Sequence, residues 1–230
     1  MARPKARNGG DVVVLASGGL DSSVLVAHLV RQGATVYPLF LKGGLVWEKA
    51  ELACLERFLE ALPSRIARGV RPLKVAALPM DDIYGEHWST TGLGVPEWSA
   101  PDESVYLPGR NLAMLVKAAV HASLLGVGRV AIGVLKGNPF PDATPGFFRA
   151  LERALAGGLG APMALEAPFL HLDKVEVIRM AADLPIHLTF SCSNPSDSEA
   201  CGACAKCRER ILALGSAAVA SGSLLEDSPK

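Results

Sequence analysis

The sequence predicts one α/β domain with a doubly wound, mostly parallel sheet. Two observations predict this class: short apolar runs alternate with longer segments that carry apolar residues at helical spacing, and a Gly- and Ser-rich turn directly follows the first run. Strands that alternate with helices need crossover connections, and these favour parallel pairing with helices on both faces of the sheet. At 230 residues, 50% of them apolar, the chain is long enough to bury one sizeable core.

The first part of the chain contains two strand–helix pairs. Residues 12–16 predict a buried strand, because their apolar run is uninterrupted, and residues 20–31 predict a helix with apolar side chains on one face. Residues 34–41 form the second apolar run. Residues 46–62 return to helical spacing and predict the second helix.

The remaining elements repeat this order. Residues 73–80 predict a third strand, and residues 109–126 predict a long helix that ends at a glycine. Residues 129–135 predict the fourth strand. Two further helices are expected over residues 144–158 and 172–184.

The overall charge is balanced, with 23 Lys and Arg residues against 23 Asp and Glu residues. This balance offers no electrostatic basis for stable binding to nucleic acid or to an acidic membrane surface. The apolar runs are far shorter than the roughly 20 residues of a membrane span, and the start of the chain lacks a signal-peptide core. We therefore predict a cytoplasmic protein that does not associate with membranes.

The turn Ser17-Gly18-Gly19 comes after the first strand, where parallel sheets place their ligands. Glycines let backbone N–H groups approach an anion, and the positive end of the next helix points to the same place. The stretch is neither a Walker A loop nor a GxGxxG fingerprint. It predicts phosphate binding, and a tight turn without a ligand is the alternative.

Asp21 follows this turn and cannot bind phosphate alone, because like charges repel. We expect its carboxylate either to bind Mg²⁺ together with the phosphates or to cap the helix. The hydroxyls of Ser17, Ser22 and Ser23 can add hydrogen-bond donors.

Four of the five cysteines lie close together near the carboxyl end, in a Cys-x8-CxxCxxC pattern. Four thiolates satisfy tetrahedral Zn²⁺ and leave no open position for a catalytic water, so a structural zinc site is expected. The alternatives are an iron–sulfur cluster and unliganded thiols. The predicted metal ligands are Cys192, Cys201, Cys204 and Cys207.

We expect a single domain over residues 1–230. Its α/β core covers residues 10–190, a zinc-binding subregion with a helix covers 191–220, and a flexible tail covers 221–230. Residues 84–108 are rich in Gly, Pro, Ser and Trp and are either a linker or a functional lid.

The Ser-Gly-Gly-x-Asp-Ser pattern after the first strand resembles the pyrophosphate loop (PP-loop) of the ATP pyrophosphatases. The resemblance implies an adenine nucleotide alpha hydrolase-like, Rossmann-like core. It also implies ATP cleavage between the α- and β-phosphates and an adenylated intermediate. The residues expected to bind ATP, with Mg²⁺, are Ala16, Ser17, Gly18, Gly19, Leu20, Asp21, Ser22, Ser23 and Val24.

The same loop, combined with the cysteine pattern and the following Arg208, resembles the 7-cyano-7-deazaguanine synthase family of queuosine biosynthesis. Arg110 and Asn111 match the family's Pro-x-Arg-Asn segment. Asp142 matches its Tyr-Pro-Asp segment, and Lys174 matches its "PL…K" segment. These elements occur in the family's order and span most of the chain.

The resemblance implies a ligase that forms carbon–nitrogen bonds. The family converts the carboxylate of 7-carboxy-7-deazaguanine into a nitrile with ATP and ammonia, through adenylated and amide intermediates. Adenylation supplies the leaving group that a carboxylate lacks. Free ammonium is the expected nitrogen source, because no glutaminase domain fits in 230 residues.

By the same resemblance, Asp21, Arg110 and Lys174 are the expected catalytic residues. Arg110 would hold the substrate carboxylate or a phosphate, and Lys174 would neutralise charge in the transition state. A surface salt bridge and a solvated helix charge are their respective alternatives. Arg110, Asn111 and Asp142 are the expected substrate-binding residues, although Asn111 could cap its own helix, and Asp142 could bind metal or cap the helix that follows it.

Two stretches depart from the family pattern. The family's Tyr-Gly-Gln-Arg-His run is replaced by one that keeps only a Gly pair, Lys42 and Glu51. Its Asp-Cys-Arg step becomes Asp142-Ala143-Thr144, so Arg149 could replace the missing arginine. Acceptor specificity would reside in these stretches.

Two other functions therefore stay open: a related ligase acting on another deazapurine, a tRNA base or a protein carboxylate, and a zinc-knuckle module that binds nucleotides or nucleic acid. A homodimer is also expected, because the family is often dimeric. Trp47, Trp88 and Trp98 could mark an interface or a lid.

Overall fold

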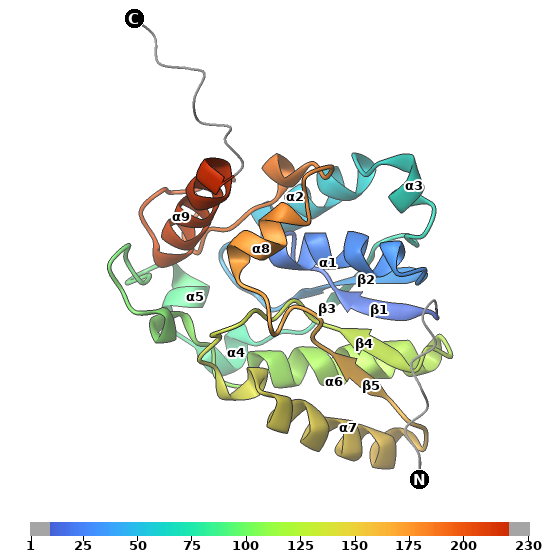
Figure 1. The fold of residues 1–230 in the computed structure, drawn as a ribbon. Helices are drawn as coiled ribbons and strands as arrows, with labels where there is room; N and C mark the ends of the chain where they lie inside the picture. Colours follow the sequence, from blue (N-terminus) through green and yellow to red (C-terminus); the bar gives the residue numbers. More distant parts are fainter. Residues whose placement is uncertain (1–9, 221–230) are drawn as a thin grey trace, which may run out of the picture.

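The computed structural model describes residues 10–220 (Figure 1). Its centre is a five-stranded parallel sheet with the strand order β3-β2-β1-β4-β5. The strands are β1 (Val12–Leu15), β2 (Val36–Lys42), β3 (Lys74–Ala77), β4 (Arg129–Ala131) and β5 (Ala164–Glu166).

The order of the strands reverses beside β1. Val13 on β1 pairs with Tyr37 on β2 and with Val130 on β4, so β1 is the central strand. The chain runs outward from β1 to β3 and then crosses to the other side of β1 to form β4 and β5. In such sheets a crevice opens beyond the carboxyl ends of the two strands where the order reverses.

Helices cover both faces of the sheet, as Figure 1 shows. Helices α1, α2, α8 and α9 contribute to one apolar layer, and α6 and α7 contribute to the other. The helices are α1 (Leu20–Arg31), α2 (Glu48–Glu60), α3 (Ser64–Ala67), α4 (Asp81–Tyr84), α5 (Trp88–Thr91), α6 (Arg110–Leu124), α7 (Pro145–Leu159), α8 (Lys174–Arg179) and α9 (Ala205–Ala220), with 3₁₀ turns at Asp102–Val105, Pro141–Ala143 and Ile186–Leu188.

The central strand explains the uninterrupted apolar run in the sequence. Val12 and Val14 point into the layer of α1 and α2, whereas Val13 and Leu15 point into the layer of α6 and α7. All four are at most 3% exposed. A strand covered on both faces has no polar side to present, so its sequence does not alternate.

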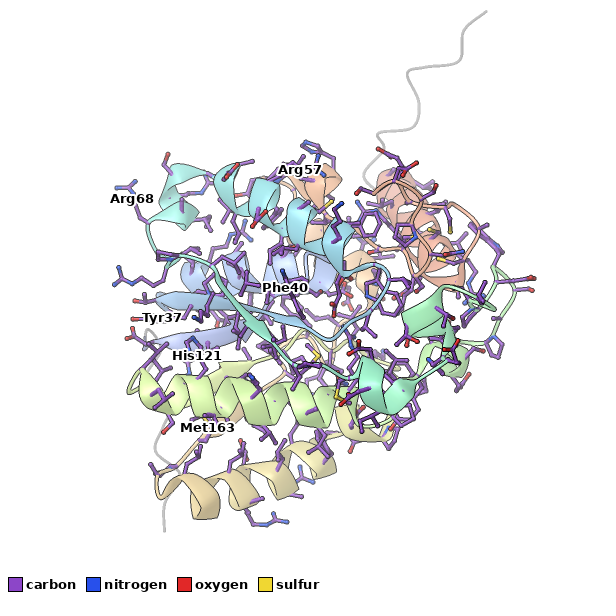
Figure 2. The ribbon with its side chains drawn as sticks, turned by 180° about the vertical axis from the view of Figure 1, so that it is seen from behind. Tyr37, Phe40, Arg57, Arg68, His121 and Met163 are labelled. Carbon is purple, nitrogen blue, oxygen red and sulfur yellow. The ribbon has the colours of Figure 1, made fainter. Side chains whose placement is uncertain are left out.

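The view from behind shows the same separation of buried apolar side chains from exposed charged ones (Figure 2). Phe40 on β2 is buried beneath the helices, whereas Arg57 and Arg68 extend outward at the periphery. Burying a phenylalanine side chain contributes roughly 1.5–3 kcal/mol to folding.

The predicted doubly wound class is confirmed, and every predicted strand and helix is present. The helix over residues 20–31 has the predicted ends, whereas the ends of the other elements are shifted. The strand expected over residues 129–135 spans only Arg129–Ala131, and the helix expected over residues 172–184 spans only Lys174–Arg179. Strand β5 was not predicted, because three residues in a Pro-bounded stretch are too few to show a period. The four-residue helices α3, α4 and α5 were missed for the same reason.

The cysteine-rich part of the chain packs onto the core. Helix α9 lies against α8, and Ala213 and Ala217 join the apolar layer of α1. The boundary expected at residue 190 stays a prediction, and the tail expected over residues 221–230 lies outside the described residues. Within residues 10–220, no helix combines the length and apolarity needed to cross a membrane.

Candidate functional site

A cleft of about 380 Å³ opens at the carboxyl ends of β1 and β4, where the strand order reverses. Leu15 and Ile132, next to these ends, line it. The start of α1, the first turn of α6, the first turn of α8 and the start of α9 converge on it. The three residues expected to be catalytic, Asp21, Arg110 and Lys174, all line this cleft.

The turn between β1 and α1 depends on Gly18. Its φ angle is +80°, and a Cβ atom here would lie 2.2 Å from the carbonyl oxygen of Glu51. Its own carbonyl oxygen accepts a hydrogen bond of 2.9 Å from the backbone N–H of Phe190. No side chain fits this position, because the backbone of α2 lies directly against the turn.

Hydroxyl groups hold the turn in shape. The Ser22 Oγ accepts a hydrogen bond of 3.1 Å from the backbone N–H of Ser17 and lies 3.1 Å from the Ser17 Oγ. No described residue accepts from the backbone N–H groups of Leu20, Asp21 and Ser22. These donors at the positive end of a 12-residue helix border the cleft and can bind an anion.

Asp21 and Lys174 form an ion pair at the edge of this turn. The Lys174 Nζ lies 3.1 Å from the Asp21 Oδ2. Burial raises the pKa of Asp21, although Lys174 opposes this effect. The Asp21 Oδ1 is buried and has no hydrogen-bond partner among the described residues. This orphan oxygen can accept a cation or a ligand proton.

Two alternatives considered for these residues are wrong. Asp21 does not cap α1, because Gly19 is the N-cap residue and no side chain bonds there. Lys174 is not a solvated helix charge, because its side chain is only 14% exposed. Burial lowers the pKa of Lys174, but the charges of Asp21 and Glu209 outweigh this effect and raise it.

Glu209, on α9, is a member of the site that the sequence analysis missed. Its Oε1 lies 2.5 Å from the Lys174 Nζ, and its Oε2 lies 3.1 Å from the Lys206 Nζ. Burial opposes ionisation of Glu209, yet Lys206 and Lys174 together lower its pKa to about 2. No motif pointed to Glu209, since Lys174, its partner on α8, is 35 positions away in the sequence.

Arg110 occupies the first turn of α6, and Asp142 anchors that turn. The Asp142 Oδ2 accepts a hydrogen bond of 3.0 Å from the backbone N–H of Asn111, and its Oδ1 accepts one of 3.2 Å from the Asn111 Nδ2. Asp142 therefore satisfies an orphan donor of α6 rather than of α7, whose cap is Thr144. No carboxylate in the described part of the chain forms an ion pair with Arg110, so the surface salt bridge considered for it is absent.

The four clustered cysteines converge as their spacing predicted. The Sγ atoms of Cys192, Cys201, Cys204 and Cys207 all lie within 4.8 Å of one another. Four sulfurs at about 2.3 Å from a tetrahedral ion would be about 3.8 Å apart, so this cluster can hold a metal ion.

Backbone donors surround the cluster. The N–H groups of Asn194 and Cys201 donate to the Cys192 Sγ at 3.3 and 3.4 Å, and the N–H of Ser193 donates to the Cys204 Sγ at 3.4 Å. Hydrogen bonds to sulfur favour the thiolate, which is the form that binds metal.

A family model described as "Queuosine biosynthesis protein QueC" matches residues 11–218. The chain belongs to the QueC family. The match covers the turn after β1 and the cysteine cluster together, so the resemblance stated from the motifs is confirmed.

Similar curated proteins are named 7-cyano-7-deazaguanine synthase. One from Anaeromyxobacter sp. (strain Fw109-5) is 32% identical and covers 92% of this chain and 94% of its own. Another from Azoarcus sp. (strain BH72) is 33% identical, and the match covers 90% of this chain and 93% of that protein. A third from Anaeromyxobacter dehalogenans (strain 2CP-C) is 34% identical, and the match covers 90% of this chain and 92% of that protein.

A solved structure described as a 4-thiouridine synthetase–RNA complex with bound ATP shares the fold. Its TM-score is 0.53 at 16% identity, over 93% of this chain and 53% of that one. At this identity the likeness shows the fold alone, and it confirms the fold class expected for the QueC family chain.

Not every residue expected to bind the nucleotide lines the cleft of this QueC family member. Ser17, Gly19, Leu20, Asp21 and Ser22 do so. The other four expected residues lie behind the turn or in the core, where they support the turn. They are Ala16, Gly18, Ser23 and Val24.

Glu51 is a further acidic group in the cleft, and the sequence left its role open. Burial raises its pKa to about 8, although Arg110 opposes this shift, so the carboxyl group is largely neutral at pH 7. A neutral acid beside Arg110 does not compete for the positive charge of the guanidinium. Arg110 stays available for an anionic ligand.

Two aromatic pairs contribute to the walls of the cleft. Trp47 and Trp88 stack with their ring centroids 5.6 Å apart, and Tyr106 and Phe140 lie 5.1 Å apart. Trp47 and Trp88 therefore belong to the cleft. Trp98 lies outside it and is 38% exposed.

Residues 84–108 are held against the cysteine cluster. Arg208, directly after Cys207, donates to the carbonyl oxygen of Ala100 and to the Asp102 Oδ1, both at 2.8 Å. Because Trp88 and Tyr106 of this segment line the cleft, the segment forms one of its walls. It is not a linker between domains, and a lid motion stays a prediction.

Proposed function

We propose that this chain converts 7-carboxy-7-deazaguanine, ATP and ammonia into 7-cyano-7-deazaguanine, the queuosine precursor, in the cleft between β1 and β4. One observation carries the proposal: the family match extends over both the turn after β1 and the cysteine cluster, and the two features border the same cleft. The similar proteins named 7-cyano-7-deazaguanine synthase also cover 90% or more of the chain.

The nucleotide would lie at the start of α1. The unpaired N–H groups of Leu20, Asp21 and Ser22 can bind its phosphates, with Ser17 and Ser22 shaping the turn. Mg²⁺ would bind at the orphan Oδ1 of Asp21 and offset the phosphate charge there. Lys174 would neutralise negative charge that develops in the transition state.

The acceptor would lie between the aromatic pairs and the start of α6. The Arg110 guanidinium suits its carboxylate, because the planar fork can donate two parallel hydrogen bonds. Asn111 uses its amide nitrogen to bind Asp142, so its Oδ1 is left to accept a hydrogen bond from the heterocycle. Asp142 would act by holding Arg110 and Asn111 in place.

The chemistry follows the needs of a carboxylate, which is a poor electrophile. Adenylation by ATP supplies a leaving group, and ammonia displaces it to form an amide. A second ATP adenylates the amide oxygen, which then leaves with AMP while the nitrogen loses two protons, and the nitrile forms. The chain's part is to align the carboxylate with the α-phosphate and to balance the charge.

We assign Zn²⁺ to the cysteine cluster. The spacing of the sulfurs suits one tetrahedral ion, whereas an iron–sulfur cluster would hold the thiolates farther apart. All four positions are taken by cysteine, so the ion would stabilise the fold and not bind a reacting water.

We also propose a nitrogen source, an oligomeric state and a cellular location. Free ammonium is the nitrogen source, and the chain forms a homodimer, which sedimentation velocity can measure. A cytoplasmic location accords with ATP use and with the five cysteines, all in the described part of the chain, forming no disulfide.

The test is to incubate the purified protein with ATP, Mg²⁺, ammonium and 7-carboxy-7-deazaguanine, following the nucleotide products and the mass of the heterocycle. We expect a nitrile that requires ammonium. ATP cleavage without nitrile would point instead to a related ligase with a different acceptor. Turnover with the free base that is unaffected by added tRNA would exclude a nucleic-acid-binding module.

A further inference from the structure

Lys174 is held by two carboxylates that come from opposite ends of the chain. Asp21 contacts it from α1 at 3.1 Å, and Glu209 contacts it from α9 at 2.5 Å. Lys174 is the first residue of α8, where Asp173 and Glu176 form a capping box that fixes the start of the helix.

We propose that Glu209 is a positioning residue, which holds Lys174 against Asp21 and so connects the cysteine cluster to the nucleotide end of the cleft. The role assigned to Glu209 rests on the proposed function, since Lys174 is expected to act in that reaction. Glu209 itself would not touch the substrate.

The contacts of Glu209 support a positioning role. Its two oxygens bind different cations, Lys174 and Lys206, so the carboxylate cannot rotate without breaking one ion pair. It lies two positions after Cys207, on a helix that packs against α8 (Figure 1). A metal ion on the cysteines would therefore also fix the start of α9 and the place of Glu209.

The charges explain why Lys174 needs the second carboxylate. A lysine side chain is long and flexible, and with Asp21 as its only partner its ammonium could move onto the phosphates. With Glu209 in place, Lys174 stays on the Asp21 Oδ2 and leaves the Oδ1 open. Replacing Glu209 with glutamine removes one negative charge and frees Lys174 to move.

Kinetics of Glu209→Gln are the first test. We expect kcat to fall roughly tenfold, while the KM for ATP stays the same or falls, because the freed ammonium still attracts phosphate. The matched control is Glu199→Gln, the same change on an exposed residue of the cysteine-rich segment, which should leave kcat unchanged. Metal content should equal the wild-type value in both variants, and both variants should remain folded at the assay temperature.

A double-mutant cycle separates positioning from general stabilisation. If Glu209 acts through Lys174, Glu209→Gln should lower kcat less than twofold in a Lys174→Gln background. An equal loss in both backgrounds, an unchanged kcat in the single variant, or a loss explained by missing metal would each overturn the proposal.

A measurement without turnover keeps this test independent of the acceptor. Acetic anhydride at low dose, followed by peptide mass spectrometry, reports how accessible Lys174 is. We expect severalfold faster acetylation of Lys174 in Glu209→Gln than in wild type or Glu199→Gln. Equal rates would overturn the positioning role even in an active enzyme, whereas absent nitrile with faster acetylation would overturn only the proposed reaction.

Discussion

The two ends of the cleft are built by different means. At the start of α1, the turn of residues 17–22 presents backbone N–H groups, and a glycine with positive φ shapes it. At the start of α9, charged side chains from three helices meet around Lys174. A site made of backbone groups therefore depends on contiguous residues, whereas a site made of side chains depends on how distant helices pack.

The largest expected effect concerns the side-chain end. Cys204→Ser should remove the metal and lower the free energy of unfolding by about 3–5 kcal/mol, because ligand loss removes both metal binding and a buried contact. Metal analysis and thermal melting measure this. Cys54→Ser, outside the cluster, is the control and should keep the metal. Full metal content with unchanged melting would contradict a structural metal site.

Asp21 joins the two ends of the cleft, because it belongs to the turn and pairs with Lys174. Replacing it should lower turnover without unfolding the protein. Asp21→Asn should lower the rate of ATP cleavage about 10²–10³-fold, because the neutral amide neither binds Mg²⁺ as well nor pairs with Lys174. Steady-state kinetics and a melting curve measure the two effects. Wild-type turnover would show that Asp21 has no part in metal binding.

One added methyl group should disrupt the turn of residues 17–22, at the backbone end of the cleft. Gly18→Ala should lower the free energy of unfolding by about 2–4 kcal/mol, because its φ is +80° and the added Cβ would meet the Glu51 carbonyl oxygen at 2.2 Å. Gly19→Ala is the control, with φ of −70° and a nearest contact of 3.3 Å. Equal denaturant midpoints for the two variants would mean that the turn has room for a side chain.

The smallest expected effect is a pH dependence at Glu51. Its pKa is about 8 in the folded protein against an ordinary 4.5, so between these values only the unfolded chain loses the proton, and stability falls as pH rises. Arg110, Glu48 and Lys206 are the charged groups that act on it. Glu51→Gln should remove this loss, so the variant should gain stability relative to wild type as the pH rises from 4.5 to 8. Parallel stability curves for the two proteins would contradict the shifted pKa.

The sequence was a good guide to the strands with uninterrupted apolar runs and a poor guide to short elements. Residues 12–16 were recognised because burial on both faces leaves no polar position. Strand β5 was missed because its three residues, Ala164–Glu166, show no period. The predicted carboxyl end of β4 also extended too far, since the strand ends at Ala131 and residues 132–135 line the cleft.

Some parts of the candidate site could be predicted from the sequence and others could not. The sequence by itself determined the turn after β1, because contiguous residues form it, and the cysteine cluster, because the spacing of the four cysteines suits one metal ion. It also pointed to Lys174 and Asp142 as candidate site residues, but not to the ion pairs and hydrogen bonds that they form.

Only the tertiary structure decided that Lys174 pairs with Asp21 and Glu209, and that Asp142 anchors the start of α6 and not of α7. The physical reason is distance along the chain. Ion pairs and hydrogen bonds between side chains act over a few ångströms, and which residues come that close depends on the crossovers and helix packing of the whole sheet.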